Sequence, residues 1–325
     1  MGATLGTLAN AGRDKATIIT PPPLEALGLW IEQLIAESTG KEGKGILPVA
    51  NEAVGTPGSY GNDRVFVQIR TLDGPALEDN AALLALAKAG HPVLDLVMSD
   101  PSDLGAEFFR WEIAVPLAGK IIGIDPFDQP NVQESKDNTK SLLATFDKDG
   151  KLPTLKALAT FEGITFSIAP DDTTISVSGS DRAAAVGILK AHFGRVKPGD
   201  YVAITQYFDE QDRRDVAIQS IRIHLRDRLK VATTTGYGPR FLHSTGQLHK
   251  GGGDQGVFTQ LTATDGADIP IPNEKFGFAT LVAAQALGDF QSLAKRHRRA
   301  LNINLGSDVD KGLVTLKSLL AEAVK

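Results

Sequence analysis

The sequence predicts an α/β protein of two lobes, each with a parallel sheet flanked by helices, joined by an α+β insert. Short β-branched runs alternate with longer amphipathic stretches, the pattern of parallel strands covered by helices. This alternation fills residues 1–136, is interrupted over 137–199 and starts again over 200–325. The length of 325 residues also suits two domains better than one.

The first lobe is predicted to contain four strands among four helices. A helix of small residues ends near Gly12, and the strand that follows ends at Pro21–Pro23, because proline cannot continue a ladder of hydrogen bonds. The other helices are expected at 24–38, 77–89 and 104–123, and the strands at 16–20, 46–50, 64–70 and 92–98. The last helix leads into a proline-flanked loop predicted to carry Gln129 and Lys136.

The insert and the second lobe are assigned in the same way. In the insert, helices are expected at 140–146, 155–161 and 182–193, with a hairpin over 164–177 that turns at 170–172. In the second lobe, strands are expected at 201–206, 231–235, 257–263 and 300–305, and helices at 213–229, 276–298 and 309–324. A glycine-rich loop is expected over 236–256.

The two lobes are interpreted as copies of one unit. Strands 64–70 and 92–98 align with 257–263 and 267–272, and the helix starting at Phe108 aligns with the one starting at Phe276. Glu37-Ser-Thr-Gly-Lys aligns with His243-Ser-Thr-Gly-Gln. Glu37 and His243 are therefore predicted to occupy equivalent loops of two pseudo-symmetric lobes.

The composition excludes several classes of protein. A net charge of −5 argues against a nucleic-acid partner, and the basic run 295–299 fits a solvated helix face. With no cysteine, disulfides, thiol nucleophiles and cysteine metal clusters are ruled out. No apolar run reaches the ~20 residues of a membrane helix and no signal peptide is evident, so a cytoplasmic protein without a membrane partner is expected. The abrupt first helix suggests that a longer chain continues upstream.

Familiar cofactor and catalytic motifs are also missing. The sequence has no P-loop, no G-x-G-x-x-G after a strand, no H-E-x-x-H and no G-x-S-x-G. His243 and His249 lack a neighbouring carboxylate cluster. Neither a metal nor an organic cofactor is therefore predicted.

The remaining candidate groups are polar side chains at the ends of elements. Glu37 closes an amphipathic helix, and Ser38, Thr39 and the Gly40 amide could donate to an anion. His243 stands beside Ser244 and Thr245 in a similar setting. Each has an ordinary alternative: a surface glutamate, a locally bonded turn histidine and, for Lys136, a solvated lysine.

Three motifs resemble those of phosphoglucose isomerases. Gly123-Ile-Asp-Pro-Phe-Asp-Gln-Pro-Asn-Val-Gln-Glu-Ser-Lys136 is similar to the family pattern G-x-N-P-F-D-Q-x-G-V-E-x-x-K. Glu37-Ser-Thr-Gly-Lys41 matches E-S-x-G-K, and Leu242-His-Ser-Thr-Gly-Gln247 is similar to L-H-S-M-G-Q. The stretches EQLIAESTGKEGKG, FFRWE and GYGPRFLHSTGQLHKGG more narrowly resemble the isomerase half of bacterial transaldolase/phosphoglucose isomerase fusions, over nearly the whole chain.

The chain departs from the family in three respects. Asn131 and Gln133 replace the family's glycine and glutamate, and the histidine motif follows the Gln129–Lys136 segment instead of preceding it. The S-K-[ST]-G-T-T phosphate loop and the G-G-R-[FY]-S motif are missing. The phosphate-binding lobe is therefore expected upstream, in a longer enzyme.

The resemblance implies sugar isomerase (SIS) lobes that interconvert glucose 6-phosphate and fructose 6-phosphate through a cis-enediol. It implies Glu37 as the base, His243 and Lys136 as ring-opening groups, and substrate contacts from residues near them. These are Gln129, Ser38, Thr39, Gly40, Lys41, Arg240, Ser244 and Thr245. Arg240 could equally be a packing arginine.

The expected partners are a sugar phosphate, an upstream transaldolase domain and further copies of the chain. Two alternatives stay open: a non-catalytic sugar-phosphate-binding module, and an isomerase for another sugar phosphate.

Overall fold

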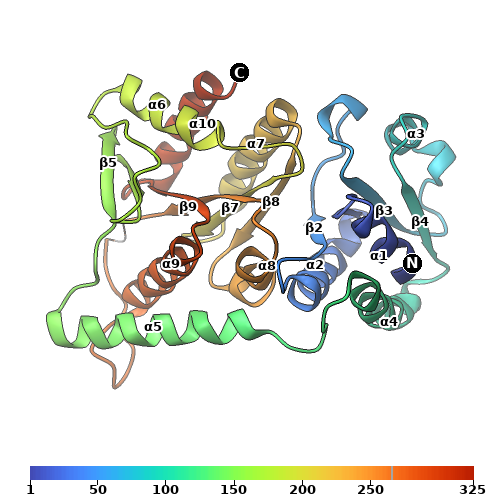
Figure 1. Cartoon of the computed structure of the whole chain (residues 1–325), viewed down its shortest axis with the longest axis horizontal. Coiled ribbons are helices and arrows are strands. Elements are labelled where there is room, and N and C mark those ends of the chain that lie inside the picture. Colours follow the sequence, from blue (N-terminus) through green and yellow to red (C-terminus); the bar gives the residue numbers. More distant parts are fainter. Residues whose placement is uncertain (265) are drawn as a thin grey trace.

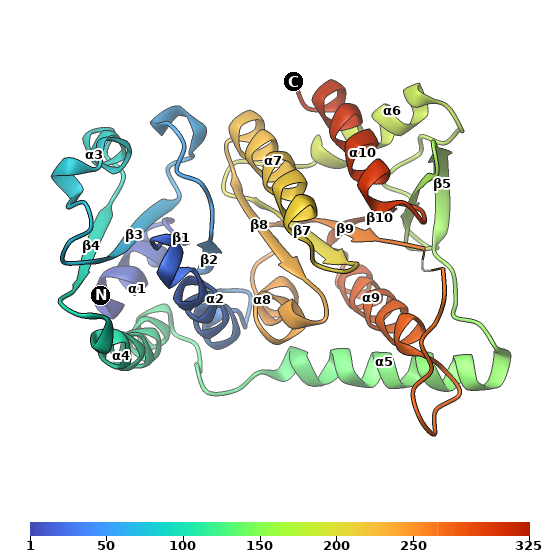
Figure 2. The same cartoon turned by 180° about the vertical axis from the view of Figure 1, so that it is seen from behind.

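The structure, a computed structural model, describes residues 1–264 and 266–325 and consists of two α/β lobes (Figures 1 and 2). The predicted α/β class is confirmed. In the first lobe four parallel strands lie in the order β2-β1-β3-β4. They are β1 (Lys15–Ile19), β2 (Leu47–Ala50), β3 (Arg64–Thr71) and β4 (Val93–Met98). The helices are α1 (Gly2–Asn10), α2 (Glu25–Thr39), α3 (Ala81–Lys88) and α4 (Leu104–Ile122), with 3-10 turns η1 (Pro22–Leu24), η2 (Pro57–Ser59), η3 (Leu77–Asp79) and η4 (Pro101–Asp103).

The second lobe contains a six-stranded sheet in the order β5-β6-β10-β9-β7-β8. Its strands are β5 (Lys156–Phe161), β6 (Ile164–Ile168), β7 (Tyr201–Tyr207), β8 (Ala232–Tyr237), β9 (Gly256–Thr262) and β10 (Arg299–Asn304). The strands β8, β7, β9 and β10 are parallel, whereas β6 runs antiparallel to both β10 and β5. The helices are α6 (Arg182–Phe193), α7 (Asp212–Leu229), α8 (Thr245–Gly251), α9 (Phe278–Lys295) and α10 (Val309–Ala323), with the 3-10 turn η5 (Arg240–His243).

A long helix, α5 (Pro130–Asp149), connects the lobes and passes beneath α8 and α9 (Figure 1). It begins at Pro130, the first-turn position that proline tolerates because the amide there has no helical partner. Lys136 therefore lies on a helix and not in the predicted loop. None of the helices among the described residues is both long and apolar enough to span a bilayer.

Part of the predicted insert forms strands of the second sheet. Residues 155–161, predicted as a helix, contain β5, and the hairpin turns at Glu162-Gly163 instead of 170–172. A register shift between Ala157 and Ala159 interrupts the alternation that identifies a strand, so the spacing looked helical. Because β6 pairs with β10, we propose that the second lobe begins at β5.

The two lobes share one strand order, because β2-β1-β3-β4 corresponds to β8-β7-β9-β10. In the alignment read from the sequence, only the pairing of β3 with β9 agrees with this order. β4 corresponds to β10, and residues 267–272 form only an isolated bridge between Pro270 and Gly277. The helices α4 and α9 are not equivalent either, because α4 follows β4 whereas α9 precedes β10. Glu37 precedes β2, whereas His243 follows β8, so the two positions are not equivalent. The sequence alignment was shifted because corresponding connections differ between the two lobes. In the second lobe, the β8–β9 connection contains η5 and α8.

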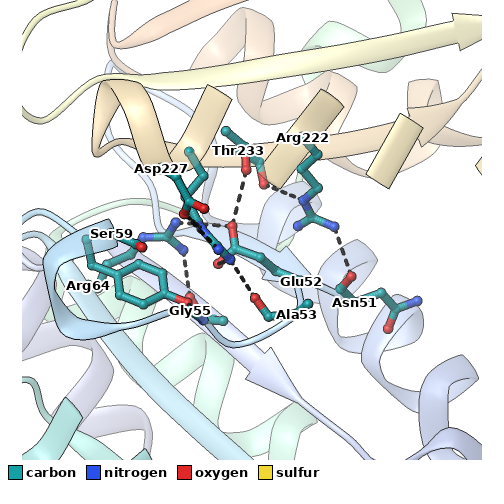
Figure 3. Close-up of polar contacts among 12 residues, drawn as sticks. Asn51, Glu52, Ala53, Gly55, Ser59, Arg64, Arg222, Asp227 and Thr233 are labelled. Carbon is teal, nitrogen blue, oxygen red and sulfur yellow. Dashed lines mark hydrogen bonds and ion pairs between the residues drawn. The ribbon is translucent and has the colours of Figure 1, made fainter. Parts of the chain in front are cut away.

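A buried polar network holds the lobes together where β2 ends (Figure 3). Arg222 of α7 donates to the Ala50 carbonyl at 3.0 Å and to the Asn51 carbonyl at 3.1 Å. The Glu52 carboxylate, fully buried, accepts from Arg64 at 3.3 Å and from Thr233 of β8 at 3.2 Å. An apolar cluster that includes Val49 of the first lobe and Ala203 of the second continues this contact.

Candidate functional site

The candidate site begins at the last turn of α2. Buried positions recur along one side of this helix and leave Glu37 and Ser38 half-buried on another. The helix ends at Gly40, where a Cβ would lie only 2.3 Å from the Leu248 Cα, so α8 can approach closely only because this residue is glycine. The Thr39 hydroxyl is used within the turn: it donates to the Ile35 carbonyl at 2.7 Å and accepts from an amide at 2.9 Å.

The loop between α4 and α5 forms the opposite wall. Gly123 ends α4 in the left-handed conformation, with φ of 80°. Lys44 donates to the Ile122 carbonyl at 3.0 Å, and the buried Lys41 ammonium binds the Asp128 carboxylate at 2.8 Å. Lys41, predicted to contact substrate, thus anchors this loop in the structure.

Glu37 and Gln129 line the same hollow, which lies between these two segments. The hollow measures about 510 Å³ and is lined by Trp30, Gln33, Leu34, Glu37, Ser38, Pro126, Phe127, Asp128 and Gln129. Since α2 runs from the end of β1 back to the start of β2, this hollow lies near the edge of the first sheet where the strands begin. It therefore lies away from the carboxyl edge, where ligands of open α/β sheets usually bind.

Gln247 of α8 joins the three segments around the site. Its side-chain amide donates to the Gly40 carbonyl and to the Asn131 side chain, both at 2.9 Å, and accepts from the Asn131 amide at 2.9 Å. Gln247 is fully buried. One turn further on, Lys250 binds Ser135 of α5 at 2.9 Å and Asp289 of α9 at 2.7 Å.

The histidine segment packs against this assembly. The turn η5, which follows a cis Gly238-Pro239 peptide, contacts both α2 and α5. His243 and Arg240 are exposed on it, whereas Ser244 and Thr245 are buried and the Ser244 hydroxyl donates to the Phe241 carbonyl at 3.2 Å.

The structure therefore brings together only part of the predicted set. Glu37, Ser38 and Gln129 line one hollow, whereas Thr39 and Ser244 bond locally. Lys136 is exposed on α5, whereas Gln129 is the residue that precedes the first turn of this helix. His243 and Arg240 lie on the neighbouring turn, outside the lining of the hollow.

Glu32 is a titratable group that the sequence reasoning missed. It is 3% exposed on α2, and burial raises its pKa to about 7, while Arg240 and Arg222 act in the opposite direction. A carboxyl group with such a pKa can exchange protons near neutral pH. The sequence signal that could have identified Glu32 is its position on the apolar stripe of α2, beside Ile31 and Ile35.

The two histidines of this region have different environments. His243 is exposed, whereas His249 is 2% exposed and stacks on Tyr201. Burial, with Lys250 and Arg298 nearby, lowers the pKa of His249 to about 3, so it is a neutral core residue. Among the described residues no group of three or more histidine, aspartate or glutamate side chains could hold a metal ion.

Comparison with known proteins relates part of the chain to isomerases. No protein-family model matches the sequence. Proteins named glucose-6-phosphate isomerase from Leptospira interrogans and Heliobacterium modesticaldum are 29% identical over 168 residues and 30% identical over 166 residues. These matches cover 40% and 39% of this chain, and 38% and 37% of the relatives. Part of the chain is thus distantly related to glucose-6-phosphate isomerases, and it matches little more than a third of their length.

Solved structures show weaker similarity. A hypothetical protein from Thermus thermophilus aligns over 99% of this chain and 82% of its own, with a TM-score of 0.34 and 12% identity. The C-terminal domain of glucosamine-fructose-6-phosphate aminotransferase from Francisella tularensis aligns over 98% and 85%, with a TM-score of 0.27 and 10% identity.

Proposed function

We propose that this chain is an aldose–ketose isomerase acting on glucose 6-phosphate and fructose 6-phosphate. The observation that carries the proposal is the shared hollow of Glu37 and Gln129, together with the contact of η5, which bears His243, with both α2 and α5. The motifs around these three residues are the ones that resemble phosphoglucose isomerases. The relatives named glucose-6-phosphate isomerase support the same reaction class.

The proposed reaction moves one proton between neighbouring carbons. The Glu37 carboxylate removes the proton from the carbon next to the carbonyl, a cis-enediol forms, and the same carboxyl group returns the proton to the adjacent carbon. Gln129 and Ser38 can orient sugar hydroxyls, since both line the hollow. His243 and Lys136 are proposed to move protons during ring opening, and Arg240 to stabilise the enediolate.

A coupled assay tests this proposal. Formation of glucose 6-phosphate from fructose 6-phosphate is followed through a dehydrogenase that reduces NADP. Glu37→Gln should lower turnover by about 10²–10⁴-fold, because the variant lacks the base, and His243→Asn should lower it by about 10²-fold. Glu42→Gln, which removes an exposed carboxylate from the same glycine-rich segment, should leave turnover unchanged.

A non-catalytic sugar-phosphate-binding module is the second candidate. It is favoured by the span of the match, little more than a third of the isomerases' length. Binding of fructose 6-phosphate without turnover would support this candidate, and turnover of another sugar phosphate alone would indicate a different isomerase. We also propose the chain as the isomerase part of a transaldolase fusion. The reading frame upstream of Met1 would then encode a transaldolase.

A further inference from the structure

A second hollow lies at the carboxyl edge of the second sheet. It measures about 290 Å³ and lies between the ends of β7, β9 and β10, helix α9 and the connection from α5 to β5. Its lining is Leu152, Pro153, Thr154, Leu155, Tyr207, Gln260, Thr262, Ala263, Val282, Ala283, Ala286, Leu287, Asn302 and Asn304. It shares no lining residue with the Glu37 hollow.

Neutral polar side chains form two rows on the sheet wall of this hollow. Tyr207 is in register with Thr262, and Thr262 with Asn304. One step earlier on the same face, Gln260 is in register with Asn302. Because registered neighbours point to one face, five hydrogen-bonding side chains converge on the hollow.

The two buried amides of this wall have fixed orientations. Asn302 donates to the Gln260 side chain at 2.9 Å, and Gln260 donates to the Ala286 carbonyl at 2.9 Å. These contacts determine which side of each amide is the donor. The wall is therefore held in a fixed arrangement by its own hydrogen bonds.

The Tyr207 hydroxyl has no hydrogen-bond partner among the described residues. Tyr207 is only 4% exposed, and its ring packs against Phe241 and under Gly238. Burial raises the pKa of this phenol well above its ordinary value, so it stays protonated and can donate. A buried hydroxyl without a partner is unfavourable, and an acceptor on a ligand would remove this cost.

The opposite wall is apolar. It consists of Val282, Ala283 and Leu287 on α9, with Leu152 and Leu155 on the connecting segment. Among the residues that the structure describes, the lining contains no lysine, arginine, aspartate or glutamate. A phosphate or carboxylate would therefore enter without a counter-charge, whereas a flat neutral ring could contact the apolar wall and hydrogen-bond at its edge.

We propose that this hollow binds a neutral heterocycle of nucleobase or nucleoside size. The asparagine amides of this wall can pair with a donor or an acceptor on the edge of such a ring. The volume lies near the lower end of the range of small-molecule sites. The proposal does not depend on the isomerase activity.

The test is a calorimetric titration of the full chain with adenosine, inosine, unphosphorylated glucose and fructose 6-phosphate. One of the two nucleosides should bind. Tyr207→Phe should weaken that binding by about 10-fold, the loss expected for one hydrogen bond. Ala283→Leu, which fills the hollow from an exposed helix position, should abolish it.

Tyr201→Phe is the matched control. Tyr201 is on the same strand, and its hydroxyl is also buried without a partner among the described residues, but it lies outside this hollow. The control should bind like the unaltered chain, and thermal unfolding should show that all variants are folded. Absence of nucleoside binding would overturn the proposal, and so would a nucleoside affinity of Tyr207→Phe or Ala283→Leu equal to that of the unaltered chain. Binding of glucose or fructose 6-phosphate that Ala283→Leu abolishes would also overturn it, because it would place the sugar in this hollow.

Discussion

The two lobes have the same order of parallel strands, yet their connections carry different groups. In the first lobe the β1–β2 connection is α2, whose last turn presents Glu37. In the second lobe the corresponding helix is α7, which supplies Arg222 and Arg226 to the contact between lobes. The second lobe instead presents His243 from its β8–β9 connection. Equivalent sheets thus act as scaffolds, and the loops and helices between strands determine the chemistry.

The largest expected effect on stability tests the contact between lobes. Glu52→Gln should destabilise the fold by about 3–5 kcal/mol, because Arg64 and Arg226 would remain buried without their carboxylate. Urea unfolding at pH 7 measures this. Asp227→Asn is the control, since Asp227 is 42% exposed beside Arg226 and its pair should contribute less than about 1 kcal/mol. Equal losses in the two variants would show that Glu52 does not hold the lobes together.

A smaller effect is expected where α8 meets the first lobe. Gln247→Leu should cost about 2–3 kcal/mol, because it leaves the Gly40 carbonyl and the Asn131 polar groups without their partner. Gln255→Leu removes a single bond of 3.1 Å to Asp14 and should cost about 1 kcal/mol or less. Urea midpoints that fall equally in both variants would contradict the joining role of Gln247.

The next prediction concerns pH and the buried face of α2. The pKa of Glu32 is raised from 4.5 to about 7, so folding favours its protonated form. The contribution of the protonated Glu32 to the free energy of unfolding is fully present below pH 4.5 and is lost as the pH rises through 7. Glu32→Gln should therefore match the unaltered chain near pH 4 and exceed its stability by about 2–3 kcal/mol at pH 8.

Urea unfolding at several pH values between 4 and 8 provides the measurement. Glu25→Gln, an exposed glutamate in the first turn of the same helix, should show no such divergence. A constant difference between Glu32→Gln and the unaltered chain across this range would show that Glu32 does not titrate there.

The smallest expected effect distinguishes two roles of Lys41. If Lys41 acts by anchoring the loop through Asp128, then Lys41→Met and Asp128→Asn should raise the KM for fructose 6-phosphate by a similar, few-fold factor. The double variant should add little to either single one, because both remove the same contact. A much larger KM increase for Lys41→Met alone would indicate direct contact with substrate.

Most elements could be predicted because their apolar periodicity is strong. The helix 182–193 and the buried strand 201–206 were located closely by their patterns. The strand β5 was missed because its register shift disturbs the period, and α5 was predicted only in part because its exposed surface carries little apolar signal. The short helix α8 was missed within a glycine-rich segment, where glycine usually indicates a loop.

The site could be predicted only as a set of residue types. The motifs singled out Glu37, Ser38 and Gln129, which line one hollow, but could not show that Thr39 and Ser244 bond locally. They also gave no sign that Tyr207, far from any motif, is a buried donor without a partner among the described residues.

The sequence by itself determined the α/β class, most strands and helices and the motif residues, because these depend on local periodicity and spacing. The tertiary structure alone decided which strands are equivalent, which motif residues share a hollow and which side chains join the lobes. Those outcomes depend on contacts between distant residues, such as Gln247 with Gly40 and Glu52 with Thr233. Such contacts leave no periodic trace in the chain, since they are fixed only when helices and sheets pack.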